Sequence, residues 1–447
     1  MCYDSTVTFL SPHKPWQIGV AVFCIALLVR LFFLPFSLLH PQPFNPSGVA
    51  FDGYYPLSLD LLAGHGFSWS TAPPYEPDSV RTPLYPLLIV GLFLIFKSYK
   101  ILFLLQVLLG SLTCVLAWLI AKSFLREEWA AATVGVLLAL EPLNAYLTGV
   151  ILTETVFTFL FLLMVWLFLR YVQNKSLAFL ALVSFLIGVS VLVKPTIQYL
   201  PILLLPLLWL VEGRRFTKKL FVHAAVLVGV FLLVISPWLY RNEILFNNAS
   251  LVVQPVSNLY AYLVPSAIAL EEHIPFQPAQ DQFFAEQHVK SIDDINLGNA
   301  KEFEHRALAE LSHHPLGLAE SVGVTMYAFF LNDGYYIVVT NFFGANFAPH
   351  FSLHALFGPE LVVLLGRAFW FVATLLMLWG IYRYVRTRGV TPELLFFAGL
   401  IAYFAVTTIV IGLAVNGRFR VPVDTFILMF AVYGATALYI EAKSRWL

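Results

Sequence analysis

Charged residues are scarce in this sequence. Asp, Glu, Lys and Arg together make up 12% of the 447 residues, whereas 60% of the residues are hydrophobic. Soluble domains carry roughly 25% charged residues, because charge keeps their surface in water. The composition therefore excludes a soluble globular domain and predicts a polytopic membrane protein.

The net charge is zero, and cysteine is rare. The 26 basic residues equal the 26 acidic ones, so no overall charge attracts a nucleic acid. Of three cysteines, Cys2 lies at the terminus, and Cys24 and Cys114 lie inside hydrophobic runs. We interpret all three as inert, because none is placed for an extracellular disulfide. The sequence contains no P-loop, dinucleotide fingerprint or GxSxG motif, and nothing in it indicates nucleotide chemistry.

Long hydrophobic runs, in contrast, are abundant. A membrane-spanning helix needs about 20 apolar residues, and Lys and Arg concentrate in short cytoplasmic loops. With both termini inside, we predict an all-α polytopic fold with about ten spans, at 16–39, 101–121, 129–147, 152–170, 177–193, 197–212, 220–239, 360–382, 391–414 and 421–440. The first run is interpreted as a retained signal anchor.

The segments between the runs define the predicted domains. The run 83–96 is short and begins at a proline, so we predict that it forms a juxtamembrane helix on the outer face. We divide the chain into an N-terminal transmembrane module with its first outer loop, a mainly helical extracytoplasmic region, and C-terminal transmembrane helices. These parts cover residues 1–240 with the loop 40–100, residues 241–359, and residues 360–447. We expect an integral protein of the inner or plasma membrane.

Ionisable residues gather at the predicted outer ends of the spans. Two are acids and five are bases: Asp52, Glu154, Arg81, Lys194, Arg241, Arg418 and Arg420. Because charged groups beside hydrocarbon are costly, such a set at one depth predicts a functional site on the extracytoplasmic side. Arg and Lys suit a phosphate or pyrophosphate, and a carboxylate beside them can transfer a proton.

Each member of this set also has a structural interpretation. The basic residues can anchor span ends at the interface or bind lipid headgroups. Asp52 can cap the helix that follows it, and Glu154 can complement a helix dipole. His65 stands alone in its loop without a partner at metal-ligand spacing, so the sequence does not predict ligation there.

Six motifs occur in an order that resembles a known family. They read FDGYY followed by DLLAGHGFS, RTPLYPLL, ALEPLNAYLTGVILTETVFTFL, SPWLYRN and GRFRVPV. The order resembles that of the membrane-embedded glycosyltransferases of the C superfamily. It is most similar to the branch related to protein O-mannosyltransferases and the aminoarabinose transferase of lipid A. The resemblance covers about residues 16–245 and the chain from 360 onward, and it is weak between them.

The resemblance implies an enzyme that takes a sugar from a polyprenyl phosphate on the outer face and transfers it to a hydroxyl or an amine. The acid after the first span, the base proposed for the family, maps onto Asp52, and the second acid maps onto Glu154. The basic residue before the juxtamembrane helix maps onto Arg81, and the arginines before the last span map onto Arg418 and Arg420.

Family members often place a second acid directly after the first, whereas here Gly53 follows Asp52. This departure leaves open whether a divalent cation binds between Asp52 and Glu154, and we predict no other cofactor. The predicted site has three parts. Its residues are catalytic Asp52, Glu154 and Arg81; donor-phosphate-binding Arg418, Arg420, Lys194 and Arg241; and substrate-binding Tyr54, Tyr55 and His65.

We therefore predict a lipid-phosphate-sugar-dependent hexosyl- or pentosyltransferase that inverts the anomeric centre with Asp52 as its single base. The expected partners are the polyprenyl-phosphate-linked donor, membrane lipids, and a glycan, lipid or protein acceptor, with no nucleic acid. Two alternatives stay open. One is a flippase or transporter of a lipid-linked sugar, for which Arg30 and Arg367 inside predicted spans are the best support. The other is a polysaccharide ligase or polymerase.

Overall fold

The computed structural model describes residues 15–39, 51–70, 72–125, 127–343 and 359–446. Within these ranges the chain is helical and contains no β-strand, apart from one isolated bridge between Ser68 and Pro77. The long apolar runs account for this, because a helix satisfies its backbone polar groups internally and can lie in hydrocarbon. The predicted all-α fold class is confirmed.

Two groups of helices make up the described chain. The main bundle contains α1 (Pro15–Leu39), α2 (Tyr54–Ala63), α3 (Leu84–Phe96), α4 (Lys100–Phe124), α5 (Glu128–Leu140), α6 (Pro142–Tyr146), α7 (Glu154–Asn174), α8 (Leu177–Val193), α9 (Leu200–Val211), α10 (Lys218–Phe246), α15 (Pro315–Leu331), α16 (Tyr335–Phe343), α17 (Pro359–Arg388), α18 (Pro392–Thr407) and α19 (Asp424–Trp446). The second group, called the insert here, contains α11 (Gln254–Asn258), a π-helical turn η4 (Leu259–Leu263), α12 (Val264–Glu271), α13 (Phe276–Glu286) and α14 (Ala300–His313).

Short 3-10 helices connect several of these elements. They are η1 (Phe51–Gly53), η2 (Leu147–Gly149), η3 (Pro195–Ile197), η5 (Ile292–Asp294), η7 (Ile409–Ala414), η8 (Gly417–Phe419) and η9 (Val421–Val423). Five of them, η1, η3, η7, η8 and η9, border the pocket described below. Irregular backbone at membrane depth is tolerated where it is enclosed by protein or lines a cavity.

The predicted count of ten spans is not confirmed. By length and composition, six described helices can cross a membrane: Trp16–Pro35, Lys100–Phe124, Glu154–Asn174, Lys218–Phe246, Leu361–Arg388 and Val421–Ser444. A seventh is added if α5 and the segment Pro142–Gly149, which meet at a bend of 57°, form one span. The other three predicted spans correspond to α8, α9 and α18, which are shorter apolar helices, as is α3.

Two of these shortened spans end or begin at identifiable breaks. The apolar run 391–414 reads as one span, but α18 ends at Thr407 and continues as η7. Gly412 within η7 has φ 53° and ψ −135°, a conformation that only glycine adopts readily, and a side chain there would overlap Ser266 of α12. In the other segment, Pro195 starts the turn η3 and delays α9 until Leu200.

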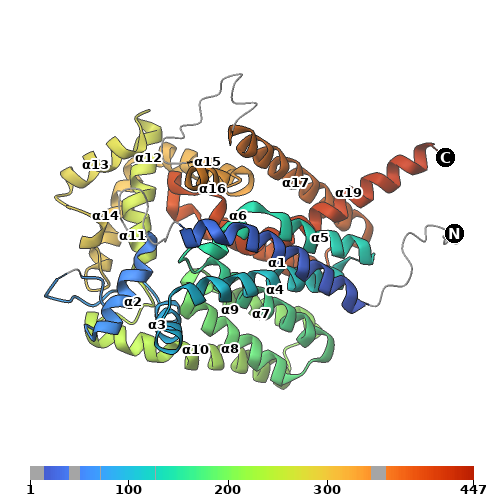
Figure 1. Cartoon of the computed structure of the whole chain (residues 1–447), viewed down its shortest axis with the longest axis horizontal. Coiled ribbons are helices and arrows are strands. Elements are labelled where there is room, and N and C mark those ends of the chain that lie inside the picture. Colours follow the sequence, from blue (N-terminus) through green and yellow to red (C-terminus); the bar gives the residue numbers. More distant parts are fainter. Residues whose placement is uncertain (1–14, 40–50, 71, 126, 344–358, 447) are drawn as a thin grey trace.

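One hydrophobic core runs through the bundle. α4 packs against α1, α5 and α7, α8 packs between α7 and α10, and α17 lies along α19. In Figure 1, α1 and α4 lie near the centre of the molecule, α8 and α10 lie along its lower side, and the C-terminal end of α19 projects on one side. Most buried aromatic and aliphatic side chains of the bundle belong to this core, which fixes α7, α8 and α19 relative to one another. A smaller apolar cluster joins α6, η2, α16, α17 and η9.

The insert has a separate apolar core at the other end of the molecule (Figure 1). Leu413 of η7 packs against this core. Ser79 of the first loop forms two hydrogen bonds with the chain near the insert. The Ser79 carbonyl accepts from the Val253 amide at 2.8 Å, and its hydroxyl accepts from the Leu297 amide at 3.3 Å. The first loop, the insert and the ends of the bundle helices thus meet at one place, and the main polar pocket lies there.

Candidate functional site

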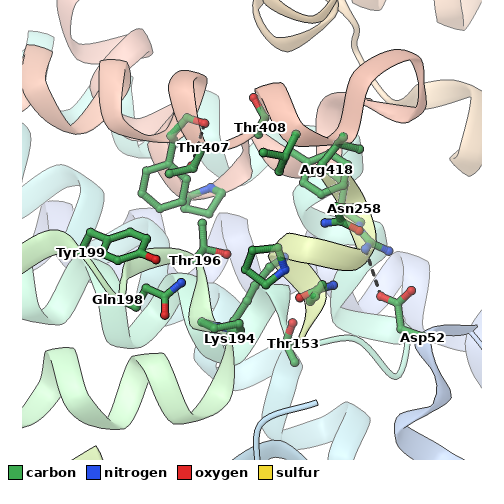
Figure 2. A pocket seen from close by; sticks show the side chains of 18 of the residues that line it. Asp52, Thr153, Lys194, Thr196, Gln198, Tyr199, Asn258, Thr407, Thr408 and Arg418 are labelled. Atoms are coloured by element: carbon green, nitrogen blue, oxygen red, sulfur yellow. Dashed lines mark hydrogen bonds and ion pairs between the residues drawn. The ribbon is translucent and has the colours of Figure 1, made fainter. Parts of the chain in front are cut away.

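A pocket of about 220 Å³ lies between the bundle and the insert (Figure 2). Its charged lining residues are Asp52, Lys194 and Arg418. The uncharged polar lining residues are Tyr54, Thr153, Thr196, Gln198, Tyr199, Gln254, Asn258, Thr407 and Thr408. The remaining lining is apolar and comes mainly from Phe404, Val410, Ile411, Phe419 and prolines. The pocket therefore has an ionic part, a ring of hydrogen-bonding groups and an apolar wall.

Arg418 joins the two candidate acids. Its Nη2 lies 3.0 Å from Asp52 Oδ2, the contact drawn in Figure 2, and its Nε lies 2.9 Å from Glu154 Oε1. Lys194 Nζ donates to the same Glu154 oxygen at 2.9 Å. The Glu154 side chain is 1% exposed, and the Arg418 and Lys194 side chains are each 17% exposed. Asp52 is 38% exposed, so it is the most accessible charge of the four.

Local backbone conformations aim these side chains at the pocket. The Asn416 side chain accepts from the Arg418 amide at 3.0 Å and starts the turn η8. Glu154 is the first residue of α7, where a carboxylate is favoured by the helix dipole. Lys194 has an extended backbone at the end of α8, which the following Pro195 favours. The carboxylate of Glu154 and the cations of Lys194 and Arg418 therefore meet although they come from three elements, α7, the end of α8 and η8.

Arg81 lies behind Asp52 and does not line the pocket. Its Nε donates to the Asp52 carbonyl oxygen, its Nη1 donates to Asp78 Oδ2, and its guanidinium lies 4.0 Å from the centre of the Trp69 ring. The side chain is only 6% exposed. Arg81 therefore holds the backbone of the loop that carries Asp52.

The same arrangement explains the glycine that departs from the family pattern. Asp52 and Gly53 both have positive φ, 51° and 68°. A Cβ atom at Gly53 would overlap the Arg81 guanidinium. A second acid directly after Asp52 therefore does not fit this loop as long as Arg81 supports it.

Arg420 and Arg241, both predicted at the donor phosphate, face away from the pocket. Arg420 is fully buried; it pairs with Asp424 at 2.8 Å and lies 3.6 Å from the centre of the Trp370 ring. Its Nη1 also donates to the carbonyls that end α15, those of Phe329, Phe330 and Asn332. Arg420 therefore joins α19 to the end of α15.

Arg241 joins α10 to the first loop. It donates to the Asp78 carbonyl at 3.0 Å and lies 4.5 Å from the centre of the Trp238 ring. Among the described residues that line the pocket, neither Arg241 nor Arg420 occurs.

The three predicted substrate-binding residues lie in different places. Tyr54 lines the pocket and packs edge-on against Tyr85, with ring centres 5.2 Å apart. Burial raises the pKa of Tyr54, and the negative charge of Asp52 raises it further, so its hydroxyl stays protonated. Tyr55 packs against Tyr99, and His65 stacks on the Tyr75 ring. Neither Tyr55 nor His65 lines the pocket.

Apart from Tyr54, sequence reasoning missed the uncharged polar residues that line the pocket. Gln254 and Asn258 come from the insert, where the motifs carry no resemblance, and Gln198 follows η3. Thr407 and Thr408 interrupt an apolar run, and that interruption is the one signal in the sequence that could have indicated them. The approach of the insert to the bundle is a long-range contact that the local pattern does not encode.

Opposing effects act on the Arg418 guanidinium. Burial by itself lowers the pKa of Arg418, but the carboxylates of Asp52 and Glu154 outweigh burial and raise the pKa above its usual value. Arg418 therefore stays charged at physiological pH. A permanent cation beside an accessible carboxylate suits the binding of an anionic group together with proton transfer.

The arrangement around Asp52 does not fit a divalent cation as it stands. No group of three or more His, Cys, Asp or Glu side chains that could hold a metal occurs in the described ranges. Asp52 and Glu154 are two carboxylates, and Arg418 already bridges them. A metal at this place would have to displace that guanidinium, so we assign no step to a metal.

Comparison with known proteins agrees with the motif resemblance. Residues 80–240 match the family model of the dolichyl-phosphate-mannose-protein mannosyltransferases. No curated protein matches the chain by sequence. The matched segment runs from the turn before Arg81 to the end of the predicted span that precedes Arg241, and it includes Glu154 and Lys194.

The fold is similar to crystal structures of an oligosaccharyltransferase from Archaeoglobus fulgidus. The form tethered to an acceptor peptide containing the NVT sequon is 16% identical with a TM-score of 0.53, covering 96% of this chain and 50% of that chain. The complex with Zn and sulfate is 16% identical with a TM-score of 0.51, covering 95% of this chain and 50% of that chain. The apo form is 14% identical with a TM-score of 0.52, covering 96% of this chain and 51% of that chain. The chain thus spans about half the length of these structures, and the likeness concerns the fold.

The family model and the solved structures both represent membrane glycosyltransferases of the C superfamily, the group that the motifs resemble. The described helices, several of them long and apolar enough to cross a membrane, agree with a multi-pass membrane protein of this kind.

Proposed function

We propose that this chain transfers a sugar from a polyprenyl phosphate to an acceptor hydroxyl or amine on the extracytoplasmic face of the membrane. The observation that carries the proposal is the ion-paired row Asp52–Arg418–Glu154–Lys194, which borders a pocket with an apolar wall. A lipid-linked sugar phosphate has the same sequence of chemical parts: an apolar tail, a phosphate and a hydroxylated ring.

The donor phosphate binds at Arg418 and Lys194 in this proposal. Both cations line the pocket, and Glu154 holds them together by binding both with one oxygen. As the bond between the anomeric carbon and the phosphate oxygen breaks, negative charge grows on the leaving phosphate. Fixed cations stabilise that charge without having to donate a proton.

Asp52 acts as the general base. It is the only acid among the described pocket-lining residues, and its carboxylate is 38% exposed, so an acceptor can reach it. The base removes the acceptor proton while the acceptor attacks the anomeric carbon on the face opposite the phosphate. One displacement by one base inverts the anomeric configuration, in contrast to retaining enzymes that use two carboxyl groups in succession.

The other predicted basic residues support the site from outside the pocket. Arg81 holds the Asp52 backbone, and Arg241 and Arg420 connect the first loop, α10, α15 and α19 that surround the pocket. The carboxamides of Gln198, Gln254 and Asn258 line the pocket next to the ionic row, where such groups hydrogen-bond to sugar hydroxyls.

The test is a transfer reaction with purified protein in lipid nanodiscs and a defined polyprenyl-phosphate sugar. We expect a product whose anomeric configuration, measured by NMR, is opposite to that of the donor. A product with retained configuration excludes the single displacement. Movement of the intact donor across a vesicle membrane without any transfer product would instead show a flippase.

A further inference from the structure

Arg30 is a buried cation that the proposed mechanism does not use. It lies in α1 and is 2% exposed, and its Nη1 donates to the Ala26 carbonyl at 3.2 Å within the same helix. In the described part of the chain no carboxylate forms an ion pair with it, and its Nε has no hydrogen-bond partner. An unpaired guanidinium in a span is costly, and such residues usually face a polar cavity in the bundle.

A small cavity lies between Arg30 and Glu154, a member of the ionic row. It is lined by α1, α4, α6, η2, α7 and η9, through residues that include Glu154, Thr155, Thr158, Thr113 and Asn144. Its volume is about 10 Å³, which is close to the space that one water molecule requires. The cavity is therefore too small for a substrate or an organic ligand.

Three buried polar atoms of the lining residues lack partners in the described ranges. They are Arg30 Nε, Glu154 Oε2 and Thr158 Oγ1. The side chains that carry them are 2%, 1% and 4% exposed, so bulk water does not satisfy them. Leaving such groups unpaired costs about 1–3 kcal/mol each, and an internal water with two to four polar partners removes that cost.

We propose that this cavity is an internal water site that connects Arg30 to Glu154. The water accepts a hydrogen bond from Arg30 Nε–H and donates to Glu154 Oε2 and to Thr158 Oγ1. One molecule then satisfies all three atoms, because a water has two protons to donate and lone pairs that accept. Thr113 lines the same cavity, but its hydroxyl already donates to the Leu109 carbonyl at 2.8 Å, so it takes no part.

The water site makes Arg30 a positioning residue for the ionic row, a consequence that rests on the proposed function. Glu154 Oε1 binds Lys194 and Arg418, and the water holds Glu154 Oε2. A carboxylate fixed at both oxygens keeps its plane, and it therefore keeps the two cations at a constant separation for the donor phosphate. Without the water, Glu154 is held at one oxygen only.

The cavity also borders a second buried cluster. Asn144 lines it, and the Asn144 amide donates to Glu141 at 2.9 Å and to Asp424 at 3.1 Å. Of these two carboxyl groups, Asp424 pairs with Arg420. Asn144 thus connects the cavity to a buried cluster of two acids and one base.

The direct test is a cryo-EM structure in lipid nanodiscs at a resolution that shows ordered waters. We expect density for one water within hydrogen-bond distance of Arg30 Nε, Glu154 Oε2 and Thr158 Oγ1 in the unmodified protein and in Thr113→Val. In Thr158→Val we expect this density to be lost or displaced. A cavity without density in the unmodified protein overturns the water site, and so does density that is unchanged in Thr158→Val.

The positioning role is tested by binding of polyprenyl monophosphate to Arg30→Leu, Arg30→Lys and Thr113→Val. We expect about tenfold weaker binding for Arg30→Leu without a lower melting temperature, because the leucine also removes a buried charge. Arg30→Lys should recover part of the affinity, and Thr113→Val should bind as the unmodified protein does. Unchanged binding by Arg30→Leu overturns the positioning role. If the unmodified protein binds no polyprenyl phosphate, the proposed function fails, and the water density still decides the site.

Discussion

Arg418 and Arg420 are two residues apart and have different surroundings. Arg418 lines the pocket between Asp52 and Glu154, whereas Arg420 is fully buried between α19 and the end of α15. Arg418 lies in the 3-10 turn η8, and Arg420 lies between η8 and η9. Their motif predicts that both arginines bind one phosphate, and of the two only Arg418 lines the pocket.

We predict that Arg418→Ala weakens binding of a polyprenyl-phosphate donor by about 10- to 100-fold, because charge-assisted hydrogen bonds contribute about 1.5–3 kcal/mol. Arg418→Lys should lose less, since it keeps the charge but not the planar fork. Titration of the donor with protein in nanodiscs measures both variants. Equal affinity of Arg418→Ala and the unmodified protein would remove Arg418 from the donor site.

Arg420→Ala should act on stability instead. Removing one partner of a buried pair leaves Asp424 uncompensated, which typically costs about 3–5 kcal/mol. We expect a clearly lower melting temperature, while the protein that remains folded binds the donor with unchanged affinity. The opposite pattern, an unchanged melting temperature with reduced donor affinity, would place Arg420 at the phosphate after all.

Asp52, Glu154, Lys194 and Arg418 were predictable as a group, because ionisable residues at span ends are few and costly. Their partners were not predictable. Neither the role of Arg81 as a support for the Asp52 backbone nor the overlap that excludes a side chain at Gly53 is visible without coordinates. Both depend on a contact between residues 29 positions apart.

At the scale of elements, α11 determines part of the pocket wall. It has five residues, and Gln254 at its start and Asn258 at its end both reach the pocket. The π-helical turn η4 follows directly, and insertions of this kind often occur at functional sites. A short helix of the insert therefore contributes carboxamides to a pocket whose charges come from the bundle.

We predict that Gln254→Leu and Asn258→Leu each lower kcat/KM for the donor by about three- to tenfold, because each removes a hydrogen bond to a sugar hydroxyl. Gln277→Leu is the matched control, since Gln277 lies on α13 and bonds to Gln280 and Asp281 of the same helix. Donor affinity measured with polyprenyl monophosphate, which lacks the sugar, should stay constant in all three variants. Similar losses in all three would show that the pocket residues have no special role.

Several element boundaries depart from the hydrophobic pattern for local reasons. A hydropathy profile does not show that Gly412 changes the direction of the backbone, or that α9 begins only after the turn that starts at Pro195. Runs that read as complete spans are therefore short helices joined to 3-10 turns, and these turns line the pocket. The sequence pattern is least accurate at the site because the site is built from interrupted helices.

At the scale of the whole molecule, the sequence predicts the fold class but not the number of membrane-spanning helices. Composition alone indicates a helical membrane protein, and the described helices agree with it. The first loop and the insert lie at the same end of the molecule (Figure 1), as expected if both are on one side of the membrane. The short helices α3, α8, α9 and α18 decide how often the chain crosses.

We predict that single cysteines at exposed Glu76 and Glu286 react with a membrane-impermeant maleimide from the extracytoplasmic side, while a cysteine at exposed Arg214 reacts only after permeabilisation. The three native cysteines are replaced first. Labelling of Glu76→Cys and Glu286→Cys from opposite sides would contradict the assembly of the first loop and the insert around one extracytoplasmic pocket.

The measurement that tests the central claim most directly is mass spectrometry of lipids that copurify with the unmodified protein and with Asp52→Asn. The variant keeps Arg418 and Lys194 for the donor phosphate and loses the base that activates the acceptor. Asp60→Asn, a neighbouring substitution outside the pocket, is the control. The account predicts that Asp52→Asn is enriched in a polyprenyl-phosphate sugar relative to both other samples. Ordinary phospholipid alone in all three samples would contradict it.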